Sequence, residues 1–302
     1  MKKTISLLIL VLLIFGFIFI VSRSRKENSN SGLQVSASFY PMYFFASQIG
    51  GDKINVVNIT PAGAEPHDYD LTPLDIIKIQ QSKLLILNGA VEPWADKIKF
   101  NLKERDTRIL VAGENLESQK IEENGNVGID PHIWLSPALA KIESEKIAEE
   151  LENIDPINAN YYKSNLLNLE SELNQIDENY KNGLKNCEIN SFVTTHAAFG
   201  YLSKDYGLNQ IAIDGLSPDA EPSLSQLTKI SDFVKANKIK VIFFETLVSP
   251  KLAQTIADET HAKTLVLDPI EGVTSQDLSK GINYLTLMAS NLQNLRTSLL
   301  CK

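Results

Sequence analysis

The stretch INANYYKSNLLNLESELNQIDENYKNGLKN, residues 157–186, reads as one long polar helix near the middle of the 302-residue chain. A shorter helical segment, PALAKIESEKIAEELEN at residues 137–153, precedes it. The pair Asp155-Pro156 separates the two, because proline interrupts a helix. About 28 residues of helix would extend roughly 42 Å, at a rise of about 1.5 Å per residue. A helix of that length can connect two halves of a protein.

Short apolar runs rich in β-branched residues lie on both sides of this helix. The runs before it are LQVSAS, INVVNI, KLLILNG and RILVAG, and those after it are SFVTTH, NQIAID, IKVIFFE and KTLVLD. Segments of helical period, such as residues 41–50 and 73–82, alternate with these predicted strands. The alternation predicts an α/β fold with two lobes, each with a mostly parallel sheet flanked by helices.

The order of these elements also divides the chain into regions. We expect a signal or anchor segment with a linker at residues 1–32, an N-terminal lobe at 33–153, one long rigid linking helix at 154–184 and a C-terminal lobe at 185–302. A chain of this length is sufficient for two lobes with separate cores.

Several helix starts are marked by capping residues. The pairs Thr72-Pro73, Ser136-Pro137 and Ser249-Pro250 each place a hydroxyl before a proline at the first helical position. Ser223 with Gln226 fits a capping box.

The first residues differ from the rest of the chain. Lys2 and Lys3 precede an uncharged, strongly apolar run at residues 5–21. This run is typical of an export signal or a membrane anchor, although its helical length of roughly 25 Å is below the roughly 30 Å of a hydrocarbon core. No clear cleavage site of small residues follows it, so we favour an uncleaved anchor. No cysteine lies near residue 20, and we therefore expect no lipid attachment there.

Charge and cysteine content narrow the possible partners. Residues 1–26 contain five basic and no acidic side chains, so the formal net charge of −8 leaves −13 on the remainder. An acidic body argues against a nucleic-acid partner, which would need a basic face. The two cysteines, Cys187 and Cys301, could form a disulfide in an exported protein or could be unrelated.

Three of the four histidines fall where an α/β fold presents ligands. His67 follows the run INVVNI, His196 ends SFVTTH, and His132 lies in DPHIWLSP just before a capped helix start, while Asp268 ends KTLVLD. In an open parallel sheet, ligands bind at the carboxyl ends of the strands. Imidazole nitrogens and a carboxylate oxygen together suit a four-coordinate zinc ion. Each of these residues taken alone would more often have a structural role in a turn or at a strand end, and it is their joint pattern that favours a metal site.

Other polar residues near these positions have weaker claims. His261, in DETHAKT, has polar neighbours and is expected to be a solvated surface histidine. Glu245 ends the run VIFFE, and it could orient a ligand imidazole without binding the metal, or support a hinge. Glu65 is two residues from His67 and is expected to face solvent or the rim of the pocket.

Six stretches occur in an order that is similar to a known family. They are GAEPHDYDLTP, DPHIWLSP, TTHAAFGYLSKDYGL, SPDAEPSLSQL, FFETLVSPKLAQTIADET and LVLDP. The chain resembles, over residues 33–300, the zinc/manganese-binding solute-binding proteins of ABC importers. The resemblance implies two α/β lobes bridged by one long helix, with the metal between them. The family's ligand positions fall on His67, His132, His196 and Asp268.

The resemblance also has departures. Many zinc-specific members carry a long histidine-rich loop before the second ligand motif, whereas the matching residues 114–129 contain no histidine. Many members are anchored by a lipidated cysteine, which is missing from the N-terminal region of this chain.

The resemblance therefore implies an extracytoplasmic, monomeric solute-binding protein that captures a divalent metal and delivers it to an ABC permease. The resemblance favours zinc over manganese, because His196 occupies a position where manganese-type sites tend to have a carboxylate. One alternative is a zinc hydrolase with Glu245 or Glu65 as general base, but neither an HExxH nor a GxSxG pattern is present. Another is a surface adhesin, a label used for some members, for which the sequence has no specific motif.

Overall fold

The computed structural model describes residues 32–103, 105–116, 119–123, 126–213, 215–216 and 222–302. Residues 33–302 form one compact unit. The predicted signal or anchor run at residues 5–21 lies outside the described residues. Within the described part of the chain, no helix combines the length and the apolar character needed to cross a membrane.

The N-terminal half contains a parallel sheet of four strands in the order β2-β1-β3-β4. Its strands are β1 (Leu33–Ala37), β2 (Ile54–Asn58), β3 (Leu84–Leu87) and β4 (Arg108–Val111). Its helices are α2 (Tyr40–Gly50), α3 (Pro73–Gln81) and α4 (Ala95–Asn101), with a short 3-10 turn at Gly51–Lys53. The central strands β1 and β3 are mostly buried and the edge strands β2 and β4 are mostly half-buried, as expected for apolar runs in a parallel sheet covered by helices.

The C-terminal half repeats this architecture with the order β10-β9-β7-β8. Its strands are β7 (Ser191–Thr194), β8 (Asn209–Ala212), β9 (Val241–Phe244) and β10 (Lys263–Val266). Its helices are α7 (Gly200–Tyr206), α8 (Leu224–Ala236), α9 (Lys251–Thr260), α10 (Ser275–Ser279) and α11 (Tyr284–Ser298). The predicted fold class, two parallel sheets flanked by helices, is confirmed.

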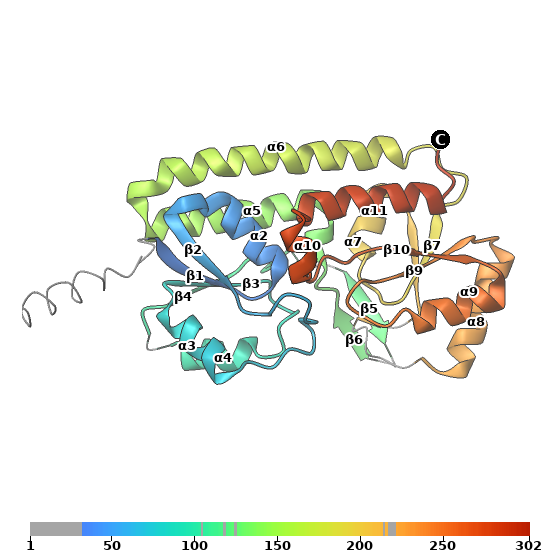
Figure 1. Ribbon diagram of the computed structural model, residues 1–302, viewed down its shortest axis with the longest axis horizontal. Helices are drawn as coiled ribbons and strands as arrows, with labels where there is room; N and C mark the ends of the chain where they lie inside the picture. Colours follow the sequence, from blue (N-terminus) through green and yellow to red (C-terminus); the bar gives the residue numbers. More distant parts are fainter. Residues whose placement is uncertain (1–31, 104, 117–118, 124–125, 214, 217–221) are drawn as a thin grey trace, which may run out of the picture. The chain divides into compact units, whose positions relative to one another are not determined.

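A long helix runs along both halves (Figure 1). Helix α6 (Ala159–Gly183) has 25 residues and follows α5 (Pro137–Ile154) after a short 3-10 turn at Pro156–Asn158. It packs against α5 and α2 from the N-terminal half and against α11 from the C-terminal half. Helix α6 lies inside the range 154–184 predicted for a linking helix, while the lobe boundaries at 153 and 185 stay predictions.

The two halves share one large cluster of buried apolar side chains, and each half also has a smaller cluster of its own. The largest cluster of buried apolar side chains includes residues of both halves. Tyr284 of α11, for example, lies against Phe44 and Phe45 of α2, with ring centroids 5.5 and 5.0 Å apart. Each half thus has apolar core residues of its own, and the shared cluster joins them beneath the long helix.

The helix caps are mostly where the sequence places them. Thr72 and Ser223 form capping boxes with Asp75 and Gln226, and Ser136 Oγ accepts a hydrogen bond from the backbone N–H of Leu139. The prediction for Ser249 is wrong, because α9 begins one residue later, after Pro250, and has no side-chain cap.

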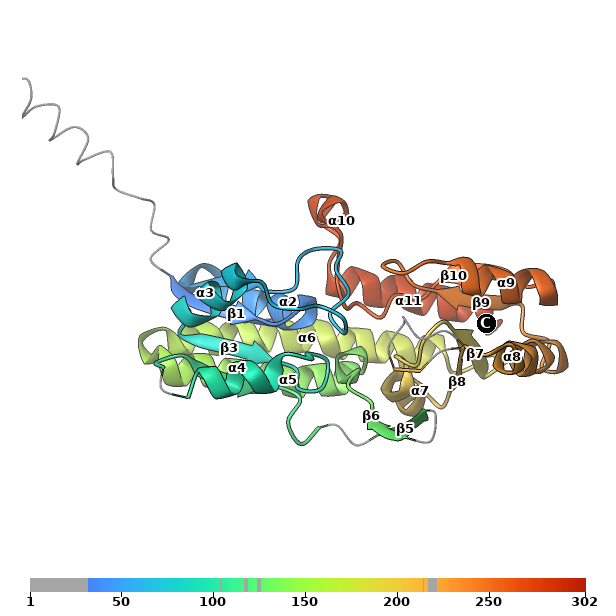
Figure 2. The same cartoon turned by 90° about the horizontal axis from the view of Figure 1, so that it is seen from below.

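One antiparallel hairpin was not predicted from the sequence. It consists of β5 (Lys120–Glu123) and β6 (Asn126–Ile129), and it precedes a 3-10 turn at Ile133–Leu135. Figure 2 shows the hairpin beside α7 of the C-terminal half. By chain order it belongs to the N-terminal half.

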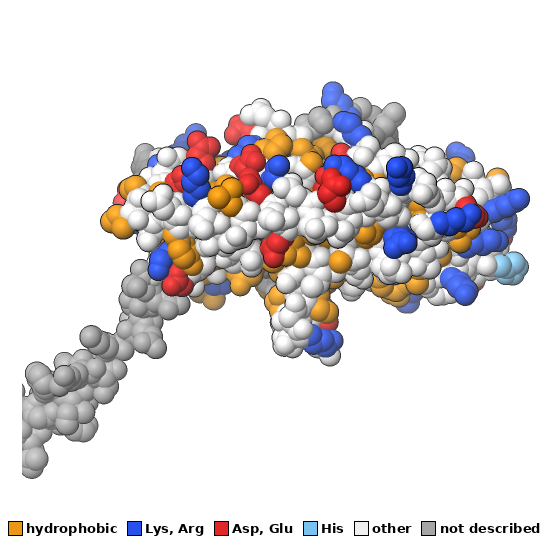
Figure 3. Space-filling model, turned by 90° about the horizontal axis from the view of Figure 1, so that it is seen from above, with side chains coloured by type: hydrophobic (Ala, Val, Ile, Leu, Met, Phe, Trp, Pro, Cys, Tyr) orange, Lys and Arg blue, Asp and Glu red, His pale blue; other side chains and the backbone are white. Residues whose placement is uncertain are grey.

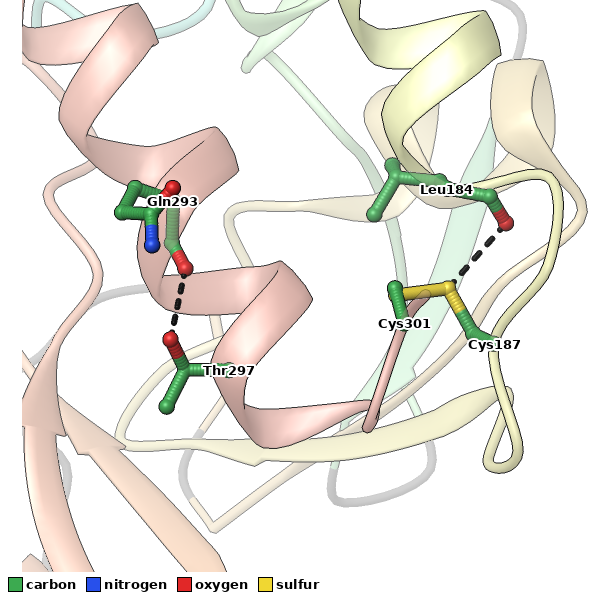
Figure 4. The surroundings of a disulfide bond; sticks show 5 residues. All are labelled: Leu184, Cys187, Gln293, Thr297 and Cys301. Atoms are coloured by element: carbon green, nitrogen blue, oxygen red, sulfur yellow. Dashed lines mark hydrogen bonds between the residues drawn. A yellow bond between two sulfur atoms is a disulfide. The ribbon is translucent and has the colours of Figure 1, made fainter.

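Cys187 and Cys301 form a disulfide, which settles the question that the sequence left open (Figure 4). The bond joins the segment after α6 to the end of the chain after α11. Backbone N–H groups of Glu188 and Ile189 also donate to the carbonyl of Leu299, both at 3.1 Å.

On the face seen in Figure 3, acidic and basic side chains are interspersed and form no continuous field of one sign.

Candidate metal centre

Four loops bring four side chains to one point. His67 lies in the irregular segment between β2 and α3, and His132 lies between β6 and the 3-10 turn before α5. His196 follows β7, and Glu271 lies between β10 and α10. One potential ligand atom from each of these residues lies within 4.8 Å of the other three. Three of the four segments follow strands of the two parallel sheets, as expected for a ligand site of such sheets, whereas His132 follows the antiparallel β5–β6 hairpin.

The distances between these atoms fit a tetrahedral metal site. His132 Nε2 lies 3.3 Å from Nε2 of His67 and 3.3 Å from Nε2 of His196. Glu271 Oε1 lies 3.2, 3.0 and 3.5 Å from Nε2 of His67, His132 and His196. Ligands about 2.0–2.1 Å from a tetrahedral zinc ion would be roughly 3.3–3.4 Å from one another. Five of the six separations among the four atoms match this spacing, and the sixth, between His67 and His196, is within 4.8 Å.

Two of the imidazoles are oriented by carboxylates. Nδ1 of His132 lies 2.8 Å from Oδ1 of Asp130, and Nδ1 of His196 lies 2.7 Å from Oε1 of Glu245. Oε1 of Glu245 also accepts a hydrogen bond from the hydroxyl of Thr195. A carboxylate at Nδ1 fixes the ring and leaves Nε2 as the free ligand atom. Glu245 thus lies behind His196, where the sequence analysis expected an orienting group.

The cluster is buried and its charges are strongly coupled. Burial alone would lower the pKa of His132, but Asp130 and Glu271 raise it above its ordinary value. Burial likewise opposes protonation of His196, yet Glu245 and Glu271 raise its pKa well above the ordinary value. Burial would raise the pKa of Glu271, but the three imidazoles hold it well below the usual range. Without metal, protons on His132 and His196 balance the buried carboxylates.

Asp268, the predicted fourth ligand, is outside this group of four. Its Oδ2 accepts a hydrogen bond from Thr246 Oγ1 and its Oδ1 accepts one from the backbone N–H of Ile270, both at 2.7 Å. Asn291 bonds both the N–H and the carbonyl of Asp268, at 2.8 and 2.6 Å. Burial raises the pKa of Asp268 to about 6. The carboxylate stabilises the turn that carries Glu271 toward the histidines.

Glu271 was missed by the sequence analysis. It is three residues after Asp268, in the stretch LDPIEG. Asp268, the predicted ligand, is the carboxylate at the end of the strand, whereas the chain turns sharply after it and brings Glu271 to the site. Ile270 has a φ of 59°, a conformation that is rare for a β-branched residue. A second carboxylate in the same short loop was the available signal.

The remaining candidates lie as follows. Glu65 is partly buried rather than solvated, and its Oε1 accepts a hydrogen bond from the backbone N–H of His67 at 3.3 Å. Burial and repulsion from Glu271 raise the pKa of Glu65 to about 9. His261 is exposed and ends α9 in a left-handed conformation with a φ of 56°.

Comparison with known proteins identifies the family. The model described as "Zinc-uptake complex component A periplasmic" matches residues 35–298. The chain belongs to this family. It is 38% identical to the high-affinity zinc uptake system protein ZnuA of Bacillus subtilis (strain 168) over 282 residues, covering 89% of this chain and 88% of that protein. It is also 38% identical to the zinc-binding lipoprotein AdcA of Streptococcus pneumoniae R6, of which it spans only 55%.

Solved structures of relatives have the same fold. The Zn(II)-bound ZnuA-like domain of Streptococcus pneumoniae AdcA matches with a TM-score of 0.78 and 37% identity, covering 89% of this chain and 99% of that domain. The laminin-binding protein Lmb of Streptococcus agalactiae, described as having adhesin and metal-transporting activity, matches with a TM-score of 0.80 and 34% identity over 89% of this chain and 99% of Lmb.

Family membership decides between the classes of function. The family is one of zinc-uptake components, so the interpretation as a metal-uptake protein is confirmed and the hydrolase interpretation is not supported. Its members are periplasmic proteins or lipoproteins. An extracytoplasmic location of the chain follows.

Proposed function

We propose that this protein captures one Zn²⁺ ion with His67, His132, His196 and Glu271 and delivers it to the permease of an ABC zinc-uptake system. The observation that carries the proposal is the convergence of the four ligand atoms, because five of their six separations are 3.0–3.5 Å and all are within 4.8 Å. The names of the relatives support zinc as the cargo.

The composition of the site suits transport better than catalysis. A catalytic zinc ion usually has three protein ligands and an open position for water, whereas four protein ligands close the coordination sphere. Three imidazoles and one carboxylate favour zinc over the harder manganese ion. Manganese is expected to occupy the site weakly.

The remaining features of the proposal concern location and partners. Residues 5–21 would hold the protein at the outer face of the membrane as an uncleaved anchor, with residues 33–302 acting as a monomer and binding no nucleic acid. Mass spectrometry of the native protein tests the anchor, because an N-terminus between residues 22 and 33 would show cleavage. Laminin binding is a property named for Lmb, and no feature of the described residues favours it here.

A competition titration tests the proposed cargo. The purified protein is stripped of metal and titrated with zinc and with manganese against a chromogenic chelator at neutral pH. We expect one zinc ion per chain and much weaker manganese binding. Equal affinity for the two ions would contradict the zinc assignment, and hydrolytic turnover with bound zinc would favour the enzyme.

A further inference from the structure

The segment that carries His132 is bonded to the opposite half of the protein. By chain order, residues 130–136 belong to the N-terminal half. Their cross-half hydrogen bonds are Tyr201 Oη to the carbonyl of Asp130 at 3.0 Å, Trp134 Nε1 to the carbonyl of Pro269 at 2.7 Å, Tyr284 Oη to the carbonyl of Trp134 at 2.5 Å, and Ser136 Oγ to Asp205 Oδ2 at 2.5 Å. Two of these bonds involve neighbours of the proposed ligands: the Tyr201 bond holds Asp130, which contacts His132, and the Trp134 bond holds Pro269, two residues before Glu271.

Tyr201 acts on the residue that orients His132. Its hydroxyl donates to the carbonyl of Asp130 and accepts a hydrogen bond from the backbone N–H of Gln119 at 3.2 Å. These two residues flank the β5–β6 hairpin, and the N–H of Asp130 donates to the carbonyl of Gln119 at 3.0 Å. One buried phenol therefore fixes the base of the hairpin and the backbone of Asp130, whose carboxylate contacts Nδ1 of His132.

Gly200 allows the two halves to approach this closely. A Cβ atom at Gly200 would lie 2.5 Å from Oδ2 of Asp130 and 3.1 Å from Oε1 of Gln119. The start of α7 thus leaves room for the carboxylate that orients His132. A side chain at this position would push the carboxylate away.

Trp134 provides the second connection. Its ring is fully buried, with its centroid 4.9 Å from that of Phe39 and 5.2 Å from that of His132. Its indole N–H donates to the carbonyl of Pro269, two residues before Glu271. The Trp134 side chain therefore spans from the ring of His132 to the loop that carries Glu271.

We infer that Tyr201 and Trp134 are positioning residues, which hold His132 and Glu271 in register across the two halves before the metal arrives. Ligands held in place by surrounding hydrogen bonds bind metal more tightly, and loss of such a partner costs about 10–100-fold in affinity. The inference rests on the proposed zinc-binding function. It adds that the affinity depends on hydrogen bonds of residues that do not touch the metal.

Tyr201→Phe tests the first connection, and the same helix provides a matched control. Tyr206 Oη donates to Asp177 Oδ1 at 3.0 Å, away from the metal centre, so Tyr206→Phe removes a similar bond. We expect Tyr201→Phe to weaken zinc binding about tenfold and Tyr206→Phe to change it less than about twofold, at similar losses of thermal stability. Equal affinities of the two variants would overturn the inference, whereas failure of the unmodified protein to bind zinc would overturn the proposed function.

Gly200→Ala separates positioning from general stability. Alanine is better than glycine in a helix, so the change should not weaken α7 itself. We nevertheless expect about a tenfold loss of zinc affinity, because the methyl group displaces the Asp130 carboxylate. Unchanged affinity would contradict this route.

A double-mutant cycle locates the effect. If Tyr201 acts through Asp130, the losses caused by Tyr201→Phe and Asp130→Asn should not add. Fully additive losses would show that Tyr201 does not act through Asp130.

Trp134→Phe tests the second connection. It preserves an aromatic ring but removes the N–H, and it should lower zinc affinity about tenfold. An unchanged affinity would remove Trp134 from the inference.

Discussion

The His67 loop and the segments that carry His132 and His196 contribute the same chemical group but hold it differently. His132 and His196 are fully buried, and each has a carboxylate against Nδ1. The side chain of His67 is 10% exposed, and among the described residues no carboxylate lies against its Nδ1. Its segment, residues 59–72, contains no helix or strand, and residues 61–63 are exposed.

This difference suggests that the four proposed ligands have two different roles in the site. His132, His196 and Glu271 are buried, and Asp130 and Glu245 lie against the two imidazoles, so on the proposed function we expect these three ligands to be held in place before metal binds. Of the four proposed ligands, His67 alone has a side chain that is exposed to solvent. We therefore expect zinc to enter and leave the site past His67. Fixed ligands supply most of the affinity, because little conformational entropy is lost when they bind.

The largest effects should come from the fixed histidines. His132→Ala and His196→Ala should each weaken zinc binding by more than about 100-fold, beyond the range for loss of an orienting partner. His67→Ala should cost less and should accelerate zinc release, which stopped-flow chelation measures. His261→Ala is the control and should leave both the zinc affinity and the rate of zinc release unchanged. If His67→Ala causes the largest loss of zinc affinity of the three, the distinction between the two buried histidines and the partly exposed His67 is wrong.

The next effect distinguishes the two carboxylates of one loop. Glu271→Gln removes the charge that lies 3.0–3.5 Å from the three imidazoles, and it should weaken zinc binding by about 100-fold or more. Asp268→Asn removes a charge that supports the turn, and it should lower thermal stability while costing about tenfold or less in affinity. Affinity measured by chelator competition, beside melting temperature, separates the two roles. The reverse order of affinity losses would restore Asp268 as the ligand.

The fate of Asp268 shows where prediction from sequence ends. The strands and the long helix follow local rules of periodicity. His67 and His196 follow from predicted strand ends, and His132 from its place before a capped helix start. The position of Glu271 depends on a left-handed Ile270 whose N–H is held by Asp268, a tertiary arrangement without a local signature. The shared core, with Tyr284 against Phe45, is likewise a long-range contact.

The charge of the cluster predicts opposite pH trends with and without metal. The pKa values of His132 and His196 are raised in the metal-free fold, so their protonation stabilises that fold below the unfolded pKa of about 6.5. This contribution is lost as the pH rises through the raised values. Zinc needs neutral imidazoles and displaces these protons, so its affinity should rise over the same range.

Melting temperatures between pH 5.5 and 8.5, with and without zinc, measure both trends. We expect the stabilisation by zinc to grow with pH, and to grow less in Glu245→Gln, which lacks one of the charges that raise the pKa of His196. A zinc-induced shift that is independent of pH would contradict the assignment of imidazole ligands.

Removal of the disulfide should have the smallest effect on zinc affinity. It should instead lower the free energy of unfolding. The Cys187–Cys301 bond closes a loop with a sequence separation of 114 residues, and removing a native disulfide typically costs about 2–4 kcal/mol through the entropy of the unfolded chain. None of the ligand residues or their orienting carboxylates contacts this bond, which ties the segments after α6 and α11 together. The double variant Cys187→Ser, Cys301→Ser should therefore melt at a lower temperature but bind zinc within about twofold of the unmodified protein, because the fixed ligands are held by Asp130 and Glu245. Denaturant unfolding and chelator competition on the same preparation measure the two quantities. A large loss of zinc affinity would mean that the fixed ligands depend on the end of the chain as well as on their carboxylates.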